Sequence, residues 1–172
     1  MRIASVSNLP FMPLSITVTF TNSKTKGGGE MANMVFRSDV KWTGESVQCD
    51  ARAGKHTIRI DEPPVLGGTD TGQNPVEMLL SALGGCLVVL VNTFAPQHDV
   101  AVKGVRVKVE GDLDPDGLMG QAPVRPGFSA IRYKLQVDSD SEPDAVAALI
   151  AHAESSCPVK DTLGGVPVSR TV

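Results

Sequence analysis

Apolar and polar side chains alternate with a period of two between residues 34 and 60, which is the pattern of strands with one buried face. The alternating stretches are 34–42, 47–52 and 56–60. The segments between them, 43–46 and 53–55, each contain a Gly, a residue that favours turns. We therefore predict an antiparallel meander of three strands with one face in solvent.

A helix with an almost continuous apolar surface is predicted from Asn74-Pro75 to about Phe94, after a loop rich in Pro and Gly. Asn is a favoured N-cap, Pro is favoured at the first helical position, and Glu77 puts a negative charge in the first turn. Pro96 is expected to end the helix. Because apolar residues nearly encircle it, we expect this helix to be buried against more than one neighbour.

The rest of the pattern predicts two strands, a second helix and a final strand. The strands are expected at 105–110 and 131–137, with a long loop at 112–127 between them, the helix at 145–156 and the last strand at 166–172. Pro158 is expected to stop the second helix. This order of elements indicates an α+β fold in which antiparallel sheet packs on helices.

Residues 1–30 differ from the remainder of the chain. A short apolar patch at 14–20 leads into a polar, Gly-rich stretch at 21–30, which is typical of a flexible linker. We interpret 1–30 as a disordered extension, or as residues read from an upstream start codon chosen in error. An extra edge strand at 15–20 is the alternative. Residues 31–172 are expected to form a single domain.

Composition narrows the classes of function. Hydrophobic residues make up 41% of the chain and aromatic residues only 4%, so the core must be aliphatic. The net charge of −3 argues against nucleic acid as a partner, because no basic stretch follows a phosphate backbone. The longest apolar run, 78–91, is shorter than the about 20 residues that span a bilayer. We expect a cytoplasmic protein with no membrane partner and no metal site.

Three cysteines are too few for a disulfide framework and fit a reducing compartment. Cys49 alternates with inward-facing residues of a predicted strand and is interpreted as a core residue. Cys86 lies on an apolar helical stripe, where a packing role is the alternative to chemistry. Cys157 follows the second helix, where we expect its sulfur to be accessible. If the fold brings Cys86 and Cys157 together, they form a redox pair.

Two segments resemble the motifs of the OsmC/Ohr family. The first is Gly67-Gly68-Thr69-Asp70-Thr71-Gly72-Gln73-Asn74-Pro75, followed by Glu77-x-Leu79-Leu80-x-Ala82-Leu83-Gly84-Gly85-Cys86. The second is Ala153-Glu154-x-x-Cys157-Pro158-Val159. Together the two motifs are specific, and the resemblance extends over about 35–172.

The resemblance implies an OsmC-like intertwined homodimer, in which antiparallel sheets with strands from both chains pack on long central helices. Peroxidases of the family reduce organic or lipid hydroperoxides with two cysteines at the dimer interface. By position, Cys86 would be the peroxidatic cysteine and Cys157 the resolving one. A small dithiol or a protein thiol would be the reductant, and no metal, flavin or haem is implied.

The chain departs from those peroxidases at the residues that activate the thiol. The family pattern has an Arg on the N-terminal sheet and a Glu directly after Asn-Pro. Here Val76 follows Pro75, and the carboxylate comes one residue later at Glu77, rotated by about 100° on a helix. Arg52 is the best candidate for the Arg by position. Other candidates are Arg37 and Arg59, and Arg125 could border the pocket.

Three other functions remain open at this point. The same fold could bind a small hydrophobic ligand and use its cysteines only for redox sensing, without peroxidase turnover. It could be a purely structural dimer, in which Cys86 only fills space. It could also be a thiol oxidoreductase with no preference for hydroperoxides.

Overall fold

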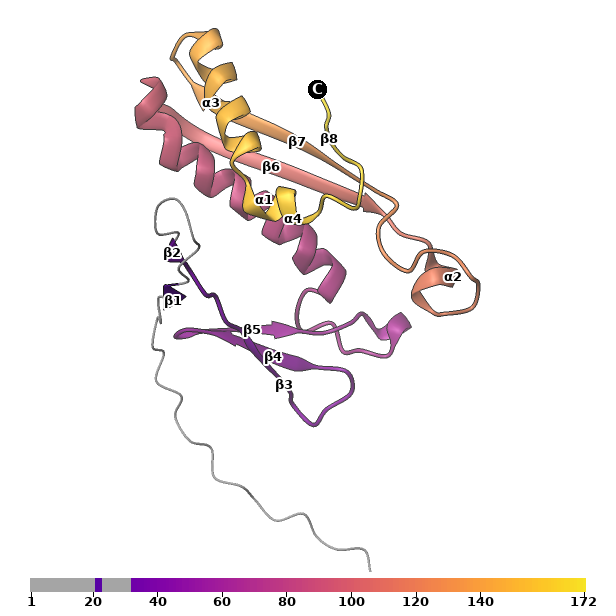
Figure 1. The fold of residues 1–172 in the computed structure, drawn as a ribbon. Helices are drawn as coiled ribbons and strands as arrows, with labels where there is room; N and C mark the ends of the chain where they lie inside the picture. Colours follow the sequence, from indigo (N-terminus) through magenta and orange to yellow (C-terminus); the bar gives the residue numbers. More distant parts are fainter. Residues whose placement is uncertain (1–20, 23–31) are drawn as a thin grey trace, which may run out of the picture. The chain divides into compact units, whose positions relative to one another are not determined.

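The computed structural model describes residues 21–22 and 32–172, and it divides the chain into two compact units (Figure 1). The N-terminal unit ends at Gly72, and the C-terminal unit comprises Gln73–Val172. The predicted extension at 1–30 lies outside the described residues except for a two-residue strand. That strand, β1 (Thr21–Asn22), pairs antiparallel with β2 (Ala32–Asn33).

The predicted meander forms the N-terminal unit. Its antiparallel strands are β3 (Asp39–Trp42), β4 (Cys49–Ala53) and β5 (His56–Ile60), in that order across the sheet. The first strand is shorter than the predicted 34–42, because pairing with β4 begins only at Asp39. Gly44 and Gly54 take positive φ values of 95° and 62° in the two turns, a backbone conformation that Gly adopts without strain.

One face of this sheet is apolar and largely uncovered. The strand register aligns Val40, Ala51 and Ile58 in one row and Trp42, Cys49 and Ile60 in the next. Val40 is 56% exposed and Trp42 61% exposed, whereas Ala51 is buried. The alternation of apolar and polar residues predicted the strands, but the expected burial of the apolar face is not met among the described residues, where much of that face is open to solvent.

Asp61 organises the loop after β5. Its buried carboxylate accepts hydrogen bonds from the backbone N–H groups of Glu62, Thr69 and Thr71 and from both threonine hydroxyls. Burial alone would raise the pKa of Asp61, but these hydrogen bonds outweigh it and hold the pKa well below its ordinary value. The loop is also tightly packed at Gly68, where a Cβ would lie 1.8 Å from the Glu62 carbonyl oxygen.

The C-terminal unit carries the long helix and the second sheet. Its elements are α1 (Pro75–Phe94), the 3₁₀ turn η2 (Ala95–His98), β6 (Val102–Asp112), α2 (Pro115–Leu118), β7 (Ala130–Ser139), α3 (Pro143–Ser155), α4 (Pro158–Thr162) and β8 (Val168–Arg170). The sheet order is β6–β7–β8, with β6 antiparallel and β8 parallel to β7.

Two details of this unit differ from the sequence prediction. The expected loop at 112–127 contains the one-turn helix α2, which Asp114 caps by accepting a hydrogen bond from the Asp116 N–H. Pro158 opens α4 instead of only stopping the preceding helix. Both helices start with Pro after a capping residue, and Pro is favoured at that position because its missing N–H would have no intrahelical partner.

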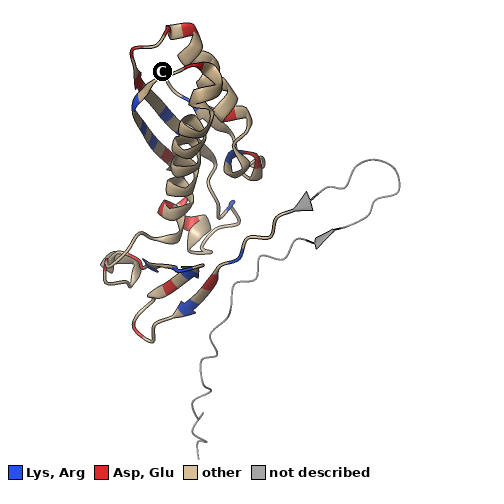
Figure 2. Cartoon of the chain, turned by 90° about the vertical axis from the view of Figure 1, so that its left-hand side faces the viewer, with Lys and Arg blue, Asp and Glu red and all other residues tan. Residues whose placement is uncertain are grey.

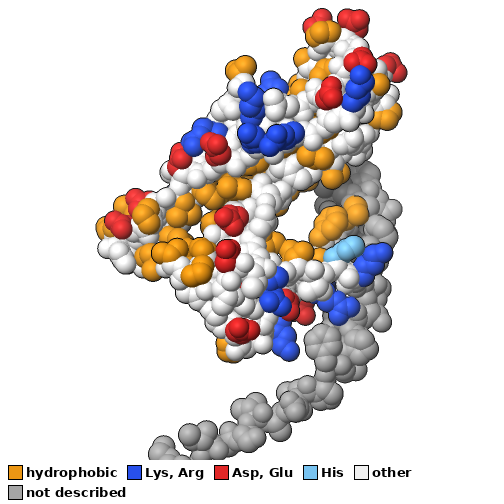
Figure 3. Space-filling model, turned by 180° about the vertical axis from the view of Figure 1, so that it is seen from behind, with side chains coloured by type: hydrophobic (Ala, Val, Ile, Leu, Met, Phe, Trp, Pro, Cys, Tyr) orange, Lys and Arg blue, Asp and Glu red, His pale blue; other side chains and the backbone are white. Residues whose placement is uncertain are grey.

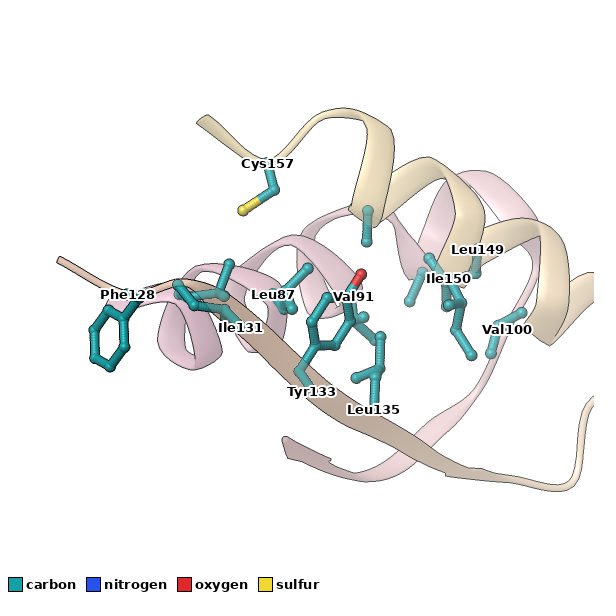
Figure 4. Packing of buried hydrophobic residues seen from close by; sticks show 13 residues of the cluster. Leu87, Val91, Val100, Phe128, Ile131, Tyr133, Leu135, Leu149, Ile150 and Cys157 are labelled. Carbon is teal, nitrogen blue, oxygen red and sulfur yellow. The ribbon is translucent and has the colours of Figure 1, made fainter. Parts of the chain in front are cut away.

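The core lies between the sheet and helices α1 and α3. Leu83, Leu87 and Val91 of α1 belong to one buried cluster with residues of β7 and α3, and Figure 4 shows Leu87 and Val91 beside Tyr133 and Leu135 of β7. The opposite face of the sheet is charged, with Lys and Arg along β6 and β7 (Figure 2). This strict alternation explains why the strands were predictable from sequence.

The structure buries only one side of α1. Val89 is 62% exposed and Leu79 40% exposed, so the prediction of burial on several sides is not met within one chain. Gly84 allows the close approach of β6, since a Cβ there would lie 3.3 Å from the Val109 side chain, whereas a Cβ at Gly85 would meet nothing within 4 Å. Figure 3 shows that apolar side chains also lie on the surface.

The continuous helical stretch of α1 and η2 is longer than the apolar run in the sequence suggested. Pro75–His98 has 24 residues and contains an 18-residue window with a mean hydropathy of 2.0, enough by length and composition to cross a membrane. The apolar run 78–91 is therefore only part of a longer helix. One such helix is weak evidence for a membrane span, because core helices of soluble proteins have the same properties.

Candidate functional site

The structure brings the sulfur atoms of Cys86 and Cys157 to 3.1 Å from each other, although 71 residues separate them in sequence. Cys86 lies on α1, and Cys157 occupies the junction between α3 and α4. A disulfide bond has a length of about 2.05 Å, so the pair is a reduced dithiol in direct contact. About 1 Å of movement separates the two sulfurs from bond formation.

Cys157 is buried, contrary to the expectation that its sulfur would be accessible at a helix end. Its side chain is 2% exposed and lies in the hydrophobic core, with the sulfur directed toward α1 (Figure 4). Cys157 is also the N-cap of α4, where Sγ accepts a hydrogen bond from the Lys160 N–H at 3.4 Å. Capping turns the side chain inward, which the sequence pattern did not reveal.

Cys86 is the more exposed residue of the pair. Burial raises the pKa of the Cys86 thiol above its ordinary value, the hydrogen bond with Cys157 acts in the same direction, and the Val159 N–H opposes both. Because the sulfurs are in contact, a charge on one disfavours a charge on the other, and the pair carries one negative charge before it carries two. Within its own unit, Cys86 therefore has geometry suited to disulfide formation.

Three side chains, one of them three residues before Cys157, are joined by a hydrogen bond and an ion pair. The Tyr133 hydroxyl of β7 donates to Glu154 Oε1 of α3 at 3.0 Å, and the Arg170 Nε of β8 lies 3.3 Å from the same oxygen. Tyr133 is 2% exposed, and its hydroxyl points toward α3 (Figure 4). Sequence reasoning missed this chain. Its signals were an inward-facing Tyr, which needs a polar partner when buried, and a Glu within the second cysteine motif.

Glu77 is placed at the start of α1, with its carboxylate engaged in a capping box. Glu77 Oε2 accepts a hydrogen bond from the Asn74 N–H at 3.1 Å, and Asn74 Oδ1 accepts one from the Glu77 N–H at 2.8 Å. Cys86 follows nine residues later, which corresponds to about 14 Å along the helix axis. The structure does not bring Glu77 to the sulfur of its own chain, and a catalytic role for it stays a prediction.

The four candidate arginines have other partners or lie in the N-terminal unit, and none of them is seen to contact Cys86 or Cys157. Arg52 is an exposed residue of β4 whose Nε donates to the Gly54 carbonyl oxygen, and Arg59 pairs with Asp50 at 2.6 Å. Arg37 is exposed. Arg125 donates to the Gly165 carbonyl oxygen at 3.0 Å. Since the N-terminal unit holds three of these residues, the activating role proposed for Arg52 stays a prediction.

A second polar cluster joins the end of α1 to α3. His98 Nε2 lies 3.0 Å from His152 Nδ1, and the Phe94 ring stacks on His152 with ring centroids 4.0 Å apart. The two imidazoles satisfy each other as a hydrogen-bonded pair. Among the residues that the structure describes, no group of three or more His, Cys, Asp or Glu side chains could hold a metal ion.

Comparisons with known proteins agree with this architecture. The model of the OsmC-like protein family matches residues 68–171. A solved OsmC-like protein from Mycoplasma pneumoniae is 20% identical, with a TM-score of 0.66 over 80% of this chain and 96% of that one. An OsmC-like protein of unknown function from Vibrio cholerae is 13% identical, with a TM-score of 0.67 over 80% and 97%.

A third solved structure has the same fold at a lower TM-score. The organic hydroperoxide resistance protein OsmC from Legionella pneumophila is 19% identical, with a TM-score of 0.55 over 80% of this chain and 97% of that one. At these identities the solved structures establish the fold alone. A search of curated proteins gave no match. The family match covers more than half of the sequence and contains both cysteines of the site, and the chain therefore belongs to the OsmC-like protein family.

Proposed function

We propose that this protein is a thiol-dependent peroxidase that reduces organic or lipid hydroperoxides with Cys86 and Cys157. The observation that carries the proposal is the 3.1 Å contact between two sulfurs that lie 71 residues apart in sequence. Two cysteines in a reduced pair, one more exposed and one buried, provide an attacking and a resolving thiol. Structural neighbours described as organic hydroperoxide resistance proteins support the choice of oxidant.

The reaction follows from thiol chemistry. The Cys86 thiolate attacks the hydroperoxide, the O–O bond breaks, and the alkoxide leaves and takes a proton to become an alcohol. Sulfur is oxidised to a sulfenic acid as the hydroperoxide is reduced. The Cys157 sulfur then attacks the Cys86 sulfur, the S–O bond breaks, and water leaves as the disulfide forms. A dithiol or a protein thiol restores both cysteines by thiol–disulfide exchange.

Peptide mapping tests the proposed pair. One equivalent of cumene hydroperoxide added to the reduced protein should give one Cys86–Cys157 disulfide and one molecule of cumyl alcohol per chain. Cys49 should remain a free thiol, because it belongs to the other unit. Scattered oxidation over all three cysteines, without this disulfide, would show that the contact has no role in peroxide reduction.

One observation favours a second function, which is redox sensing without rapid turnover. The pKa of Cys86 is raised by burial and by Cys157, and Val76 occupies the position at which peroxidases of the family carry a Glu. A thiol with a raised pKa is mostly protonated at neutral pH and reacts slowly. The same disulfide would then form over minutes and act as a redox signal. In this alternative the protein would bind a small hydrophobic ligand and would not reduce hydroperoxides rapidly.

The protein is proposed to act as a homodimer. A second copy would cover two apolar surfaces. One is the exposed apolar face of the N-terminal sheet, and the other is the exposed side of α1 around Val89 and Gly85. Isologous pairing of identical chains is the commonest way in which soluble proteins bury such surface. A dimer would also supply a second copy of Arg52 and Glu77 to each thiol pair.

Replacing Val89 with Lys should dissociate this dimer. The substitution puts an unpaired charge into the apolar stripe, and the dissociation constant should rise on the order of 100-fold or more. Sedimentation velocity over a concentration series measures the effect. Val124→Lys is the matched control, because Val124 is a similarly exposed valine outside α1, at 44%, and this variant should stay dimeric. A dimer unaffected by Val89→Lys would exclude α1 from the interface.

A further inference from the structure

We propose that the Arg170–Glu154–Tyr133 chain is a positioning device for Cys157, which holds its sulfur against Cys86 and thereby sets how readily the disulfide closes. The inference rests on the proposed function for its biological meaning, but it concerns three residues outside the cysteine pair. Three observations support it: the contacts among these residues, their burial, and the position of Glu154 three residues before Cys157.

The three side chains connect three separate elements. Tyr133 of β7 and Arg170 of β8 are direct neighbours in the parallel register, and the Thr171 N–H adds a hydrogen bond of 2.8 Å to the Tyr133 carbonyl oxygen. Glu154 comes from the last turn of α3, and its Oε1 accepts a hydrogen bond from Tyr133 and forms an ion pair with Arg170. The end of α3 is therefore fastened to the sheet at one carboxylate oxygen.

Burial makes this attachment specific. The Glu154 side chain is only 17% exposed, so its charge needs the two donors that it has. The pKa of Tyr133 is raised by burial and further by Glu154, with Arg170 opposing, so its hydroxyl stays protonated and remains a donor. Tyr133 and Cys157 belong to the same buried cluster of the C-terminal unit.

The contact between Glu154 and the sheet lies close enough in sequence to set the direction of the Cys157 side chain. Glu154 precedes Cys157 by three residues, and α3 ends between them at Ser155. Cys157 then begins α4, so the direction of its side chain depends on where the last turn of α3 is held. Only about 1 Å separates the sulfurs from disulfide distance, and a displacement of about that size can cost 100-fold in an intramolecular reaction.

The test is the equilibrium between the dithiol and the disulfide in glutathione buffers, measured in a Cys49→Ser background so that only one pair can form. Glu154→Gln keeps the side-chain size but removes the charge that Arg170 meets. We expect it to lower the effective concentration of the two thiols about 10-fold to 100-fold. Tyr133→Phe, which keeps the buried ring, should lower it in the same direction.

Matched variants separate positioning from general destabilisation. Glu142→Gln changes an exposed Glu at the other end of α3, where it makes no side-chain capping hydrogen bond, and should leave the equilibrium unchanged. Arg170→Met should resemble Glu154→Gln, and Arg170→Lys should recover most of the wild-type value. Loss of stability alone would lower the melting temperature of these variants without altering the thiol–disulfide equilibrium of the folded protein.

The buffer experiment needs no hydroperoxide, so the two proposals fail separately. If the wild type forms the disulfide in glutathione but reduces no hydroperoxide, the proposed function is wrong and the positioning role stands. If Glu154→Gln and Arg170→Met keep the wild-type equilibrium, the positioning role is wrong. If the wild type forms no Cys86–Cys157 disulfide at any glutathione ratio, both are overturned.

Discussion

Replacing Cys86 with Ser should lower the second-order rate constant for hydroperoxide reduction by on the order of 1000-fold or more. A serine hydroxyl is not ionised at neutral pH and cannot replace a thiolate as the attacking atom. Stopped-flow measurement of cumene hydroperoxide consumption gives this rate constant. Cys49→Ser is the matched control, because it removes a partly exposed thiol of the N-terminal unit, and it should change the rate less than about twofold.

The same experiment has an expected pH dependence. The pKa of Cys86 is raised by burial and by the contact with Cys157, so the thiolate fraction at neutral pH is small. The wild-type rate constant should therefore increase steadily from pH 6 to pH 9 as the thiol ionises. A flat profile over this range would mean that a cation, such as Arg52 of either copy, keeps Cys86 ionised in the assembled protein.

Replacing Cys157 with Ser should separate the two halves of the reaction. The first oxidation of Cys86 should continue, because the attacking sulfur is unchanged, but turnover with a dithiol should fall about 100-fold or more since no intramolecular thiol completes the step. One molecule of alcohol should form per chain, and Cys86 should accumulate as a sulfenic acid.

Dimedone labelling followed by mass spectrometry detects that intermediate. With excess hydroperoxide, Cys86 should proceed to sulfinic and sulfonic acids, which the disulfide normally prevents. Ser156→Ala, a change at the exposed residue next to Cys157, should keep wild-type turnover. Full turnover in Cys157→Ser would show that the external thiol reduces Cys86 directly and that the buried cysteine is not needed.

Local signals in the sequence predicted most of the fold. The start of α1 was readable because Asn74, Pro75 and Glu77 each satisfy a separate need of a helix N-terminus, and the structure forms the complete capping box. The strands of both sheets were readable because one face of each is apolar and the other charged. Both cysteine motifs pointed to a pair, and the structure brings the two sulfurs into contact.

Other features depended on information that a local pattern does not contain. Pro158 was expected to stop a helix, yet Pro is equally suited to begin one, and only the turn at Cys157 decides between these outcomes. Tyr133, Glu154 and Arg170 meet through sheet register and helix packing, which periodicity does not specify. The apolar surface of α1 signalled burial correctly as a tendency, but a single chain covers only one side of it.

The most direct test of the account is the oxidation of the reduced wild-type protein by cumene hydroperoxide and by hydrogen peroxide, followed by stopped flow. The proposed peroxidase site should give a reaction that is faster, per thiolate, than that of a free thiol, that prefers the organic hydroperoxide, and that ends in the Cys86–Cys157 disulfide. A reaction with both oxidants that is no faster than that of a free thiol would contradict it, and redox sensing without turnover would then explain the cysteine pair.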